Sequence, residues 1–269
     1  GLASEAQLAN PYGVAVDADG NLYIADASNN RIRRVDASTG MITTVAGTGL
    51  PASTGDGGLA TEAGLYFPQG ITVDSVGNLY FTDYQTAIRR VDAATGIIST
   101  VAGVWGEYVS AGDGGPATAA TFEGVTGVGV DGAGNLYLPD NQGYRLRFVD
   151  ATTGIISTIA GTGVYGYSGD GGPAAAAQFG HLPGIAVDAA GNVWVADEDN
   201  DRIRLVTSAV SPAILIGPEN KAVQVGTTVE WSLLVTGDPV PAVRWQVSTD
   251  GGVTFDDLND SAPYSGVAT

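Results

Sequence analysis

Short apolar runs alternate with polar, glycine-containing turns along most of the chain. In the first group, the runs Gly13–Asp17, Leu22–Ala25, Arg31–Val35 and Met41–Ala46 have the length and spacing of four β-strands joined by tight turns. Every residue from Leu22 to Ala25 is apolar, so both faces of this strand must be covered. The pattern predicts small antiparallel sheets, each packed between two others.

This group of strands is an internal repeat. The turn Asp-x-x-Gly-Asn recurs with a constant step of 57 residues, and it begins at Asp17, Asp74, Asp131 and Asp188. A Gly-Asp-Gly-Gly loop recurs with the same step and is centred on Asp56, Asp113 and Asp170. Units that hide their faces only against sister units form repeat architectures. We therefore predict an all-β propeller with four visible blades of four antiparallel strands each.

The segment between blades is short and rich in alanine, as in Gly115-Pro116-Ala117-Thr118-Ala119-Ala120. A proline at the first helical position predicts a single helical turn here. Residues 1–8 align with residues 58–65, so the sequence is expected to begin inside a repeat unit.

The repeated segments resemble the NHL repeat. The resemblance rests on residues 10–17, the run Gly20-Asn21-Leu22-Tyr23-Ile24-Ala25-Asp26, and Asn29-Asn30-Arg31-Ile32-Arg33. The Gly-Asp-Gly-Gly-Pro-Ala insertion is similar to that of long-repeat bacterial members, and the resemblance extends to about residue 206. It implies a propeller. Family propellers usually have six blades, so ring closure by four longer units, by units outside this chain or by another copy stays open.

The repeat fades after Val206, and we predict a propeller domain at 1–211 and a second domain at 212–269. Ala213–Ile216 fits either as the outer strand of the fourth blade or as the start of the next domain. From Pro212 onward the pattern resembles part of a bacterial immunoglobulin-like β-sandwich, with Trp245 in the place of the core tryptophan. A partial sandwich leaves a sheet edge unpaired, which predicts self-association by strand addition, up to a fibre.

Charge narrows the range of partners. The chain carries 11 basic and 29 acidic residues, a net charge of −18. Such a surface repels nucleic-acid phosphates and anionic bilayers, and no apolar run is long enough to cross a membrane. The chain has no cysteine and a single lysine, Lys221. With its acidic, small-residue-rich surface, this composition leads us to expect an extracellular or cell-surface bacterial protein.

Calcium is the cofactor that the acidic loops suggest, because it prefers oxygen ligands. We place a candidate calcium site at the loop residues Asp56, Asp113 and Asp170; the alternative is that these carboxylates cap backbone amides. Asp17-Ala18-Asp19-Gly20-Asn21 resembles the start of a calcium loop, but its sister turns lack the middle acid, which favours a hairpin turn. His181 is the only histidine, and a zinc site needs about three protein ligands, so it is assigned a structural or surface role.

Two further sets of residues stand out. Nine arginines lie on predicted third strands, and an aspartate ends each second strand (Asp26, Asp83, Asp140 and Asp197), which predicts a structural Asp–Arg pair in every blade. The loops between blades carry aromatic residues, which we predict to bind a protein or glycan partner: Trp105, Tyr108, Tyr165 and Tyr167.

The sequence contains no catalytic motif that commits it to a reaction. The function it favours is a non-catalytic extracellular module for binding, adhesion or assembly. The alternative is a calcium-dependent propeller hydrolase or lyase, which predicts a bound metal and non-repeated polar side chains on the propeller axis.

Overall fold

The computed structural model describes residues 1–188, 191–207, 213–216, 234–236, 246–247, 254 and 256–257. Contacts divide the chain into two compact units, Gly1–Val206 and Thr207–Thr269. In the second unit, β16 (Ala213–Ile216) pairs with β17 (Leu234–Thr236), and β18 (Gln246–Val247) pairs with β19 (Asp256–Asp257). Most of the predicted immunoglobulin-like region, Trp245 included, lies outside the described residues.

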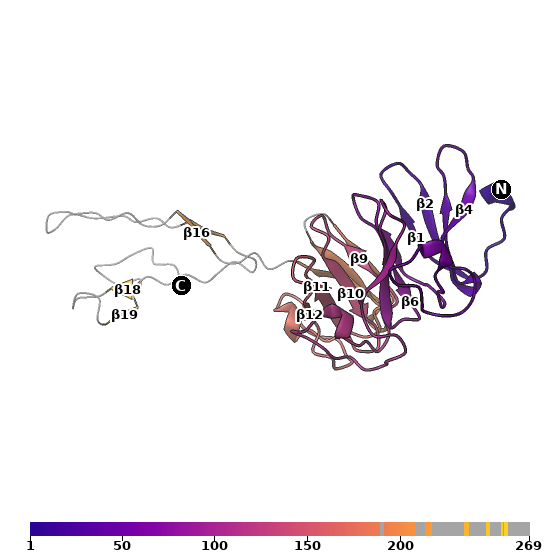
Figure 1. Cartoon of the computed structure of the whole chain (residues 1–269). Helices are drawn as coiled ribbons and strands as arrows, with labels where there is room; N and C mark the ends of the chain where they lie inside the picture. Colours follow the sequence, from indigo (N-terminus) through magenta and orange to yellow (C-terminus); the bar gives the residue numbers. More distant parts are fainter. Residues whose placement is uncertain are drawn as a thin grey trace. The chain divides into compact units, whose positions relative to one another are not determined.

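The first unit consists of four antiparallel sheets in the arrangement of propeller blades (Figure 1), which confirms the predicted fold class. Each sheet is a meander whose strand order follows the sequence. Blade 1 contains β1 (Pro11–Val16), β2 (Leu22–Asp26), β3 (Arg31–Val35) and β4 (Ile42–Ala46); blade 2 contains β5 (Ile71–Val73), β6 (Leu79–Asp83), β7 (Ala87–Val91) and β8 (Ile98–Ala102). Blade 3 contains β9 (Gly129–Val130), β10 (Leu136–Asp140), β11 (Arg145–Val149) and β12 (Ile156–Ala160); blade 4 contains β13 (Ile185–Val187), β14 (Val193–Asp197) and β15 (Arg202–Val206).

Blade 4 therefore has three strands among the described residues. Ala213–Ile216 forms β16, which pairs with β17 within the second unit.

Short 3-10 turns accompany the strands. They are η1 (Ala3–Glu5), η2 (Ala27–Asn29), η3 (Ala60–Glu62), η4 (Ala117–Ala119), η5 (Ala174–Ala176) and η6 (Glu198–Asn200). The helical turn expected in the Ala-rich segments is present as η4 and η5. Pro116 and Pro173 occupy the position before each turn and not its first residue, because their backbone is extended.

The Asp-x-x-Gly-Asn turns are hairpin turns. The Asp17 carboxylate accepts hydrogen bonds from the backbone N–H groups of Asp19 and Asn21 and from the Asn21 side chain. The Asn21 side chain in turn accepts from the N–H of Ala37 and so ties this turn to the β3–β4 turn. Blades 2 and 3 repeat the arrangement at Asp74 and Asp131. The carboxylate organises a turn, as expected for such residues.

The hydrophobic core lies between the blades, in three separate clusters. We call the blade face that meets the preceding blade its leading face, and the other its trailing face. Tyr23 and Ile32 on the trailing face of blade 1 pack with Ile71 and Phe81 on the leading face of blade 2. Burial of each such side chain contributes about 1.5–3 kcal/mol. The doubly apolar second strands follow from this packing, because each blade is covered on two sides.

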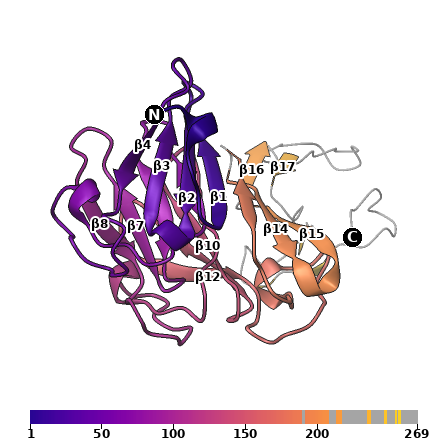
Figure 2. The same ribbon diagram turned by 90° about the vertical axis from the view of Figure 1, so that its right-hand side faces the viewer.

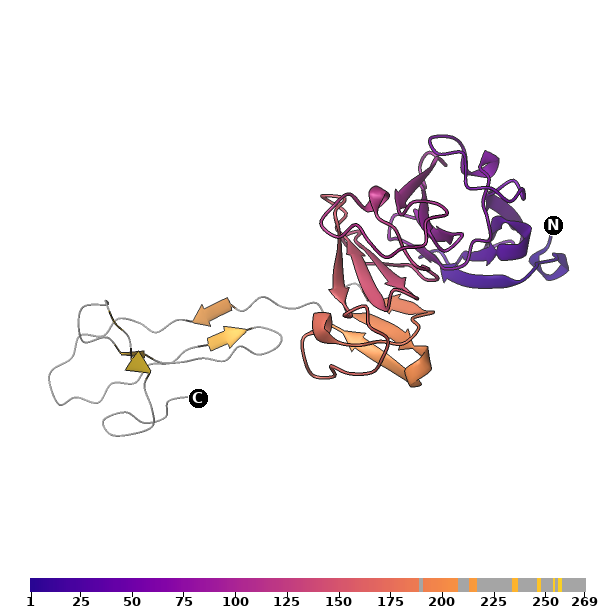
Figure 3. The ribbon, with the colours of Figure 1, turned by 90° about the horizontal axis from the view of Figure 1, so that it is seen from below.

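The two outermost faces are exceptions. Figure 3 shows the blades as an open arc with blade 1 (indigo) at one end and blade 4 (orange) at the other, and Figure 2 shows blade 1 with blade 4 to its right. On the leading face of blade 1, Val14 is 62% exposed, whereas its repeat equivalents Ile71 and Val128 are buried. On the trailing face of blade 4, Ile203 is 69% exposed, whereas Ile32 is fully buried. The described blades thus form an open arc with an exposed apolar face at each end.

One prediction concerns the alkaline stability of this core. Burial, together with the Asp131 carboxylate, raises the pKa of Tyr137 to about 12. An unfolded tyrosine loses its proton near about 10, so above that pH the unfolded chain binds fewer protons and the free energy of unfolding falls as pH rises. We expect Tyr137→Phe to show a smaller loss of stability between pH 9 and pH 11 in urea unfolding. Tyr12→Phe, at an exposed ring, is the control; an equal loss in Tyr137→Phe and wild type would contradict the assignment.

Candidate binding site on the loop face

The predicted Asp–Arg pair is present in every blade. The aspartate that ends the second strand is fully buried and lies beside the middle arginine of the third strand. The nitrogen–oxygen distances are 3.3 Å for Arg33–Asp26, 3.0 Å for Arg89–Asp83, 3.7 Å for Arg147–Asp140 and 3.2 Å for Arg204–Asp197. The same aspartate accepts a backbone N–H from the segment that enters the blade, as Asp83 does from Tyr66. Its recurrence marks it as a structural element.

The arginine has a second partner that the sequence analysis did not foresee. In blade 2, the Arg89 guanidinium bridges Asp83 and the loop residue Asp56, at 2.7 Å from the latter. Arg147 and Arg204 make the same contact with Asp113 and Asp170, at 2.7 Å and 2.6 Å. The Gly-Asp-Gly-Gly loop thus anchors each connection to the buried arginine of the next blade.

These contacts bear on the calcium site. The second oxygen of each loop aspartate is also engaged: the N–H of Thr100 donates to Asp56, the hydroxyl of Thr158 to Asp113 and the hydroxyl of Tyr167 to Asp170. The hydroxyl of Tyr167 and the nearby Arg204 hold the pKa of Asp170 below its usual value. Guanidinium, hydroxyl and backbone N–H donors thus engage both oxygens of each of these carboxylates. Among the described residues, no group of three or more acidic, histidine or cysteine side chains has the geometry of a metal site, and calcium at these loops stays a prediction.

Burial affects the inner carboxylates differently. It raises the pKa of Asp83 and of Asp140, and the arginine and hydrogen-bond donors beside them oppose that rise. These two carboxylates therefore depend on the neighbouring arginines and hydrogen-bond donors to stay charged in the core.

Blade 2 differs from the other blades in the lengths of two loops, of which one is a residue shorter and the other a residue longer. The β6–β7 loop spans residues 84–86, one residue fewer than the loops at residues 27–30 of blade 1 and 141–144 of blade 3. The following connection is one residue longer, with Asp113 eleven positions after Ala102 where Asp56 lies ten after Ala46. The constant overall step conceals both changes. Tyr84 and Gln85 adopt positive φ angles of 57° and 61° in the shortened loop.

The lengthened connection packs on the shortened loop through aromatic rings. Tyr84 lies at the centre, with ring-centroid distances of 4.5 Å to Tyr66, 5.6 Å to Trp105 and 5.9 Å to Tyr108. We call these four residues the Trp105 cluster. Trp105 and Tyr108 remain 49% and 46% exposed, so their rings are available to a ligand.

A cavity adjoins the Trp105 cluster. Its volume is about 200 Å³, and Tyr66, Phe67, Tyr84, Gln85 and Tyr108 line it. Burial and the neighbouring Tyr84 raise the pKa of Tyr108 to about 12. Aromatic walls with a few polar groups are typical of ligand sites.

The other predicted aromatic residues lie at the connection between blades 3 and 4. Tyr165 packs with Tyr144 and His181, at 5.4 Å and 6.4 Å between ring centroids, and Nδ1 of His181 lies 2.6 Å from the Asp199 carboxylate. Tyr167 instead stacks on the guanidinium of Arg202 at 4.2 Å. Tyr167 therefore supports the Asp170–Arg204 pair, whereas Tyr165 presents an exposed ring.

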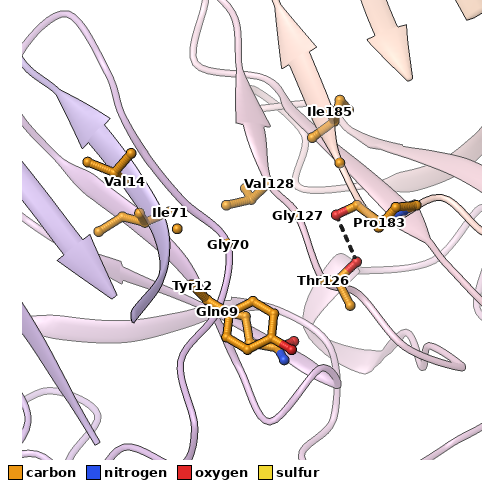
Figure 4. A pocket seen from close by; sticks show the side chains of 12 residues that line it. Tyr12, Val14, Gln69, Gly70, Ile71, Thr126, Gly127, Val128, Pro183 and Ile185 are labelled. Atoms are coloured by element: carbon orange, nitrogen blue, oxygen red, sulfur yellow. Dashed lines mark hydrogen bonds between the residues drawn. The ribbon is translucent and has the colours of Figure 1, made fainter. Parts of the chain in front are cut away.

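The innermost strands surround a second cavity, of about 190 Å³ (Figure 4). The same three positions of all four blades line it, and they are Tyr12, Gly13, Val14, Gln69, Gly70, Ile71, Thr126, Gly127, Val128, Pro183, Gly184 and Ile185. Thr126 donates a hydrogen bond to the carbonyl of Pro183. Gln69 accepts a hydrogen bond from Gln85, which lines the cavity beside the Trp105 cluster. The side chains at the first of these positions differ between blades, as the enzyme alternative requires, but none of the twelve is a metal-binding carboxylate or histidine.

Sequence analysis thus identified Trp105 and Tyr108 but missed Tyr66 and Tyr84. A repeat alignment would have shown them, since Tyr66 stands where the sister blades have Ala9, Glu123 and Gly180. Tyr84 stands where they have Ala27, Asn141 and Glu198. Residues with a structural role recur in the blades, so aromatic residues that appear once are candidates for a specific function.

Comparison with known proteins agrees with the repeat and the architecture. The sequence profile of the teneurin NHL domain matches residues 1–54 and 48–110. Teneurin-1 of Mus musculus is 29% identical over 231 residues, which cover 77% of this chain and 8% of that protein. Teneurin-3 of Danio rerio is 47% identical over 108 residues, which cover 35% of this chain and 4% of that protein. The chain thus spans less than a tenth of the length of these relatives.

Solved structures share the fold. A protein of unknown function from Bacteroides thetaiotaomicron superposes with a TM-score of 0.59 at 25% identity, over 73% of this chain and 47% of that one. An auxiliary nutrient binding protein from the same organism gives a TM-score of 0.54 at 22% identity, over 72% and 46% of the two chains. With the repeat, the blades and the profile match, these findings define the class: the chain is a β-propeller whose first repeats are similar to the teneurin NHL domain.

Proposed function

We propose that this chain is a non-catalytic, extracellular binding module that holds a protein or glycan partner on its loop face, at the Trp105 cluster. The observation that carries the proposal is the cavity of about 200 Å³ walled by aromatic rings that occur in one blade. Tyrosine and tryptophan supply large contact areas at a low entropic cost and dominate the energetics of many interfaces. The strained Tyr84–Gln85 turn fits this role, since uncommon backbone conformations concentrate at functional sites.

Electrostatics favours the same class of partner. With a net charge of −18, the chain attracts cationic surfaces and repels anionic ones. No helix among the described residues is long and apolar enough to span a membrane. An extracellular, bacterial setting and adhesion as the biological role are parts of the proposal, supported by the acidic composition, the absence of cysteine and the single lysine.

The test is a binding screen of wild-type protein against glycan and extracellular-protein arrays, followed by titration of each hit with variants. Trp105→Ala and Tyr84→Ala are expected to weaken binding about tenfold or more, because Tyr84 lines the cavity and Trp105 packs on Tyr84 with a half-exposed ring. Val76→Ala is the matched control, since Val76 is an exposed apolar residue in the β5–β6 turn at the opposite end of blade 2. A partner that binds wild type and both aromatic variants equally would contradict this site, provided that thermal unfolding shows all proteins folded.

A further inference from the structure

The outer strand of a complete blade has hydrogen-bond partners on both sides. In blade 2, β8 pairs with β7 on one side. On its other side, Ile98 donates its N–H to the carbonyl of Gly58 at 3.0 Å and accepts the N–H of Gly57 at 2.9 Å. The N–H of Ala60 extends this contact by donating to Gly96 at 2.9 Å. The Gly-Gly-x-Ala segment that precedes each blade therefore forms a second edge along the outer strand.

Blades 1 and 3 repeat this arrangement. Ile156 of β12 exchanges hydrogen bonds with Gly114 and Gly115, and Ala117 donates to Gly154. In blade 1, Ile42 donates to Gly1, and Ala3 donates to Gly40. Three blades thus show one way of holding an outer strand.

Blade 4 has the two elements that hold an outer strand in the other blades, which are its third strand β15 and the preceding Gly-Gly-x-Ala segment. Among the described residues, no strand lies between them. β15 pairs with β14 and has no described neighbour on its outer side. The groups that correspond to the second edge are the N–H of Gly171, the carbonyl of Gly172 and the N–H of Ala174, and they have no partner in the described part of the chain. The Gly172–Ala174 segment nevertheless has the sister geometry, with the 3-10 turn η5 and the hydrogen bond from Gly161 to the Ala174 carbonyl.

We propose that the space between β15 and Gly171–Ala174 is a strand-accepting site, which binds an extended segment of a second polypeptide by β-augmentation. Sheet edges with unpaired N–H and C=O groups take up strands in this way, with the backbone providing affinity and alternate side chains providing specificity. Here two facing edges act on the same strand.

The sister blades define the chemistry of the occupant. Their outer strands read Gly-Met-Ile-Thr-Thr-Val-Ala, Gly-Ile-Ile-Ser-Thr-Val-Ala and Gly-Ile-Ile-Ser-Thr-Ile-Ala. The isoleucine at the third position is buried, and the threonine at the fifth position lies opposite the middle arginine of the third strand. In blades 2 and 3 this threonine donates to the loop aspartate. An occupant of blade 4 would place its threonine opposite Arg204 and beside Asp170.

The chain itself contains one competing segment. Ala213 follows Val206 by seven residues, as Ile156 follows Val149. However, Ala213–Ile216 pairs with β17, and it has Leu215 where the sister strands have threonine. The spacing of this segment from β15 fits the site, but the segment lacks the threonine of the sister strands. We therefore favour an occupant from another polypeptide.

The test uses the nine-residue peptide Thr-Gly-Ile-Ile-Ser-Thr-Ile-Ala-Gly, the sequence of residues 153–161, labelled with a fluorophore and titrated with the full chain. We expect saturable binding, and a peptide with proline in place of serine should lose it, because proline cannot donate to the ladder. Ala174→Pro removes one edge N–H at a position whose 3-10 backbone accepts proline. It should weaken binding about fivefold to tenfold, the equivalent of one hydrogen bond. Ala174→Gly keeps the N–H and should bind like wild type.

A further variant, Ile214→Pro, separates the two sources of the strand. If wild type and Ile214→Pro both fail to bind the peptide up to about 1 mM, there is no such site and the proposal is wrong. If the peptide binds only to Ile214→Pro, the chain's own segment fills the site and an occupant from another polypeptide is excluded. Equal binding to wild type and Ile214→Pro, with loss in Ala174→Pro, supports the proposal. None of these outcomes depends on Trp105.

Discussion

Replacement of Arg89 by alanine is expected to lower the free energy of unfolding by about 3–5 kcal/mol, the typical cost of removing one partner of a buried ion pair. The Arg89 side chain is 1% exposed and bridges two carboxylates, of which Asp83 is fully buried. It also donates to the Ser53 hydroxyl and the Thr54 carbonyl. Its loss leaves Asp83 charged in the core and releases the Gly-Asp-Gly-Gly loop from blade 2. Urea unfolding at neutral pH measures the effect.

The neighbouring arginine provides the control. Arg90 lies on the same strand and pairs with Asp92 at 2.8 Å, but both side chains are 30% exposed. Arg90→Ala should therefore cost less than about 1 kcal/mol. Because burial raises the pKa of Asp83, the deficit of Arg89→Ala should shrink as pH falls and this carboxyl takes up a proton. Equal stabilities of the two variants would contradict the structural role of the bridge.

Replacement of Gly70 by alanine should be similarly damaging, at about 3 kcal/mol, the upper end of the cost of overpacking a core. A Cβ atom on Gly70 would lie 2.5 Å from the carbonyl oxygen of Thr126 and 2.7 Å from the Cα of Gly127. Both are backbone atoms of the next blade, so no side-chain rotation relieves the clash. The innermost strands of blades 2 and 3 would have to move apart. A fall in the thermal unfolding temperature and in the urea midpoint would show this.

The equivalent glycine of blade 4 is the matched control. Gly184 has the same place in the repeat, but the nearest atom to its added Cβ is the Cβ of Ala196, at 3.8 Å. No described blade follows blade 4, so Gly184→Ala should leave stability within about 0.5 kcal/mol of wild type. A loss as large as that of Gly70→Ala would show that something packs against this face of blade 4.

Particular residues show how far the sequence predicts the site. An Asp–Arg pair was predicted in every blade because an aspartate ends each second strand and arginines lie on each third strand. The sequence did not show that Arg89 and not Arg90 is the partner of Asp83, since the constant step of 57 residues aligns Arg90 with Arg33 and Arg147. The partnership of Arg89 with Asp56 was not predicted, since 33 residues separate the two and the loop aspartate matches a cation ligand equally well by sequence. Trp105 was identified by its residue type, whereas Tyr84 acquires its role only when the shortened loop meets the lengthened connection.

The sequence by itself determined the repeat, the meander of strands in each blade and the turns between them. These features depend on local preferences: the period-two burial of a strand, and the short hydrogen bonds of Asp-x-x-Gly-Asn, act over a few residues. Only the tertiary structure decided which carboxylate pairs with which arginine, which rings form the Trp105 cluster, and that β15 has no outer neighbour among the described residues. Those contacts join segments that are distant along the chain, and their geometry depends on how each blade packs against the next.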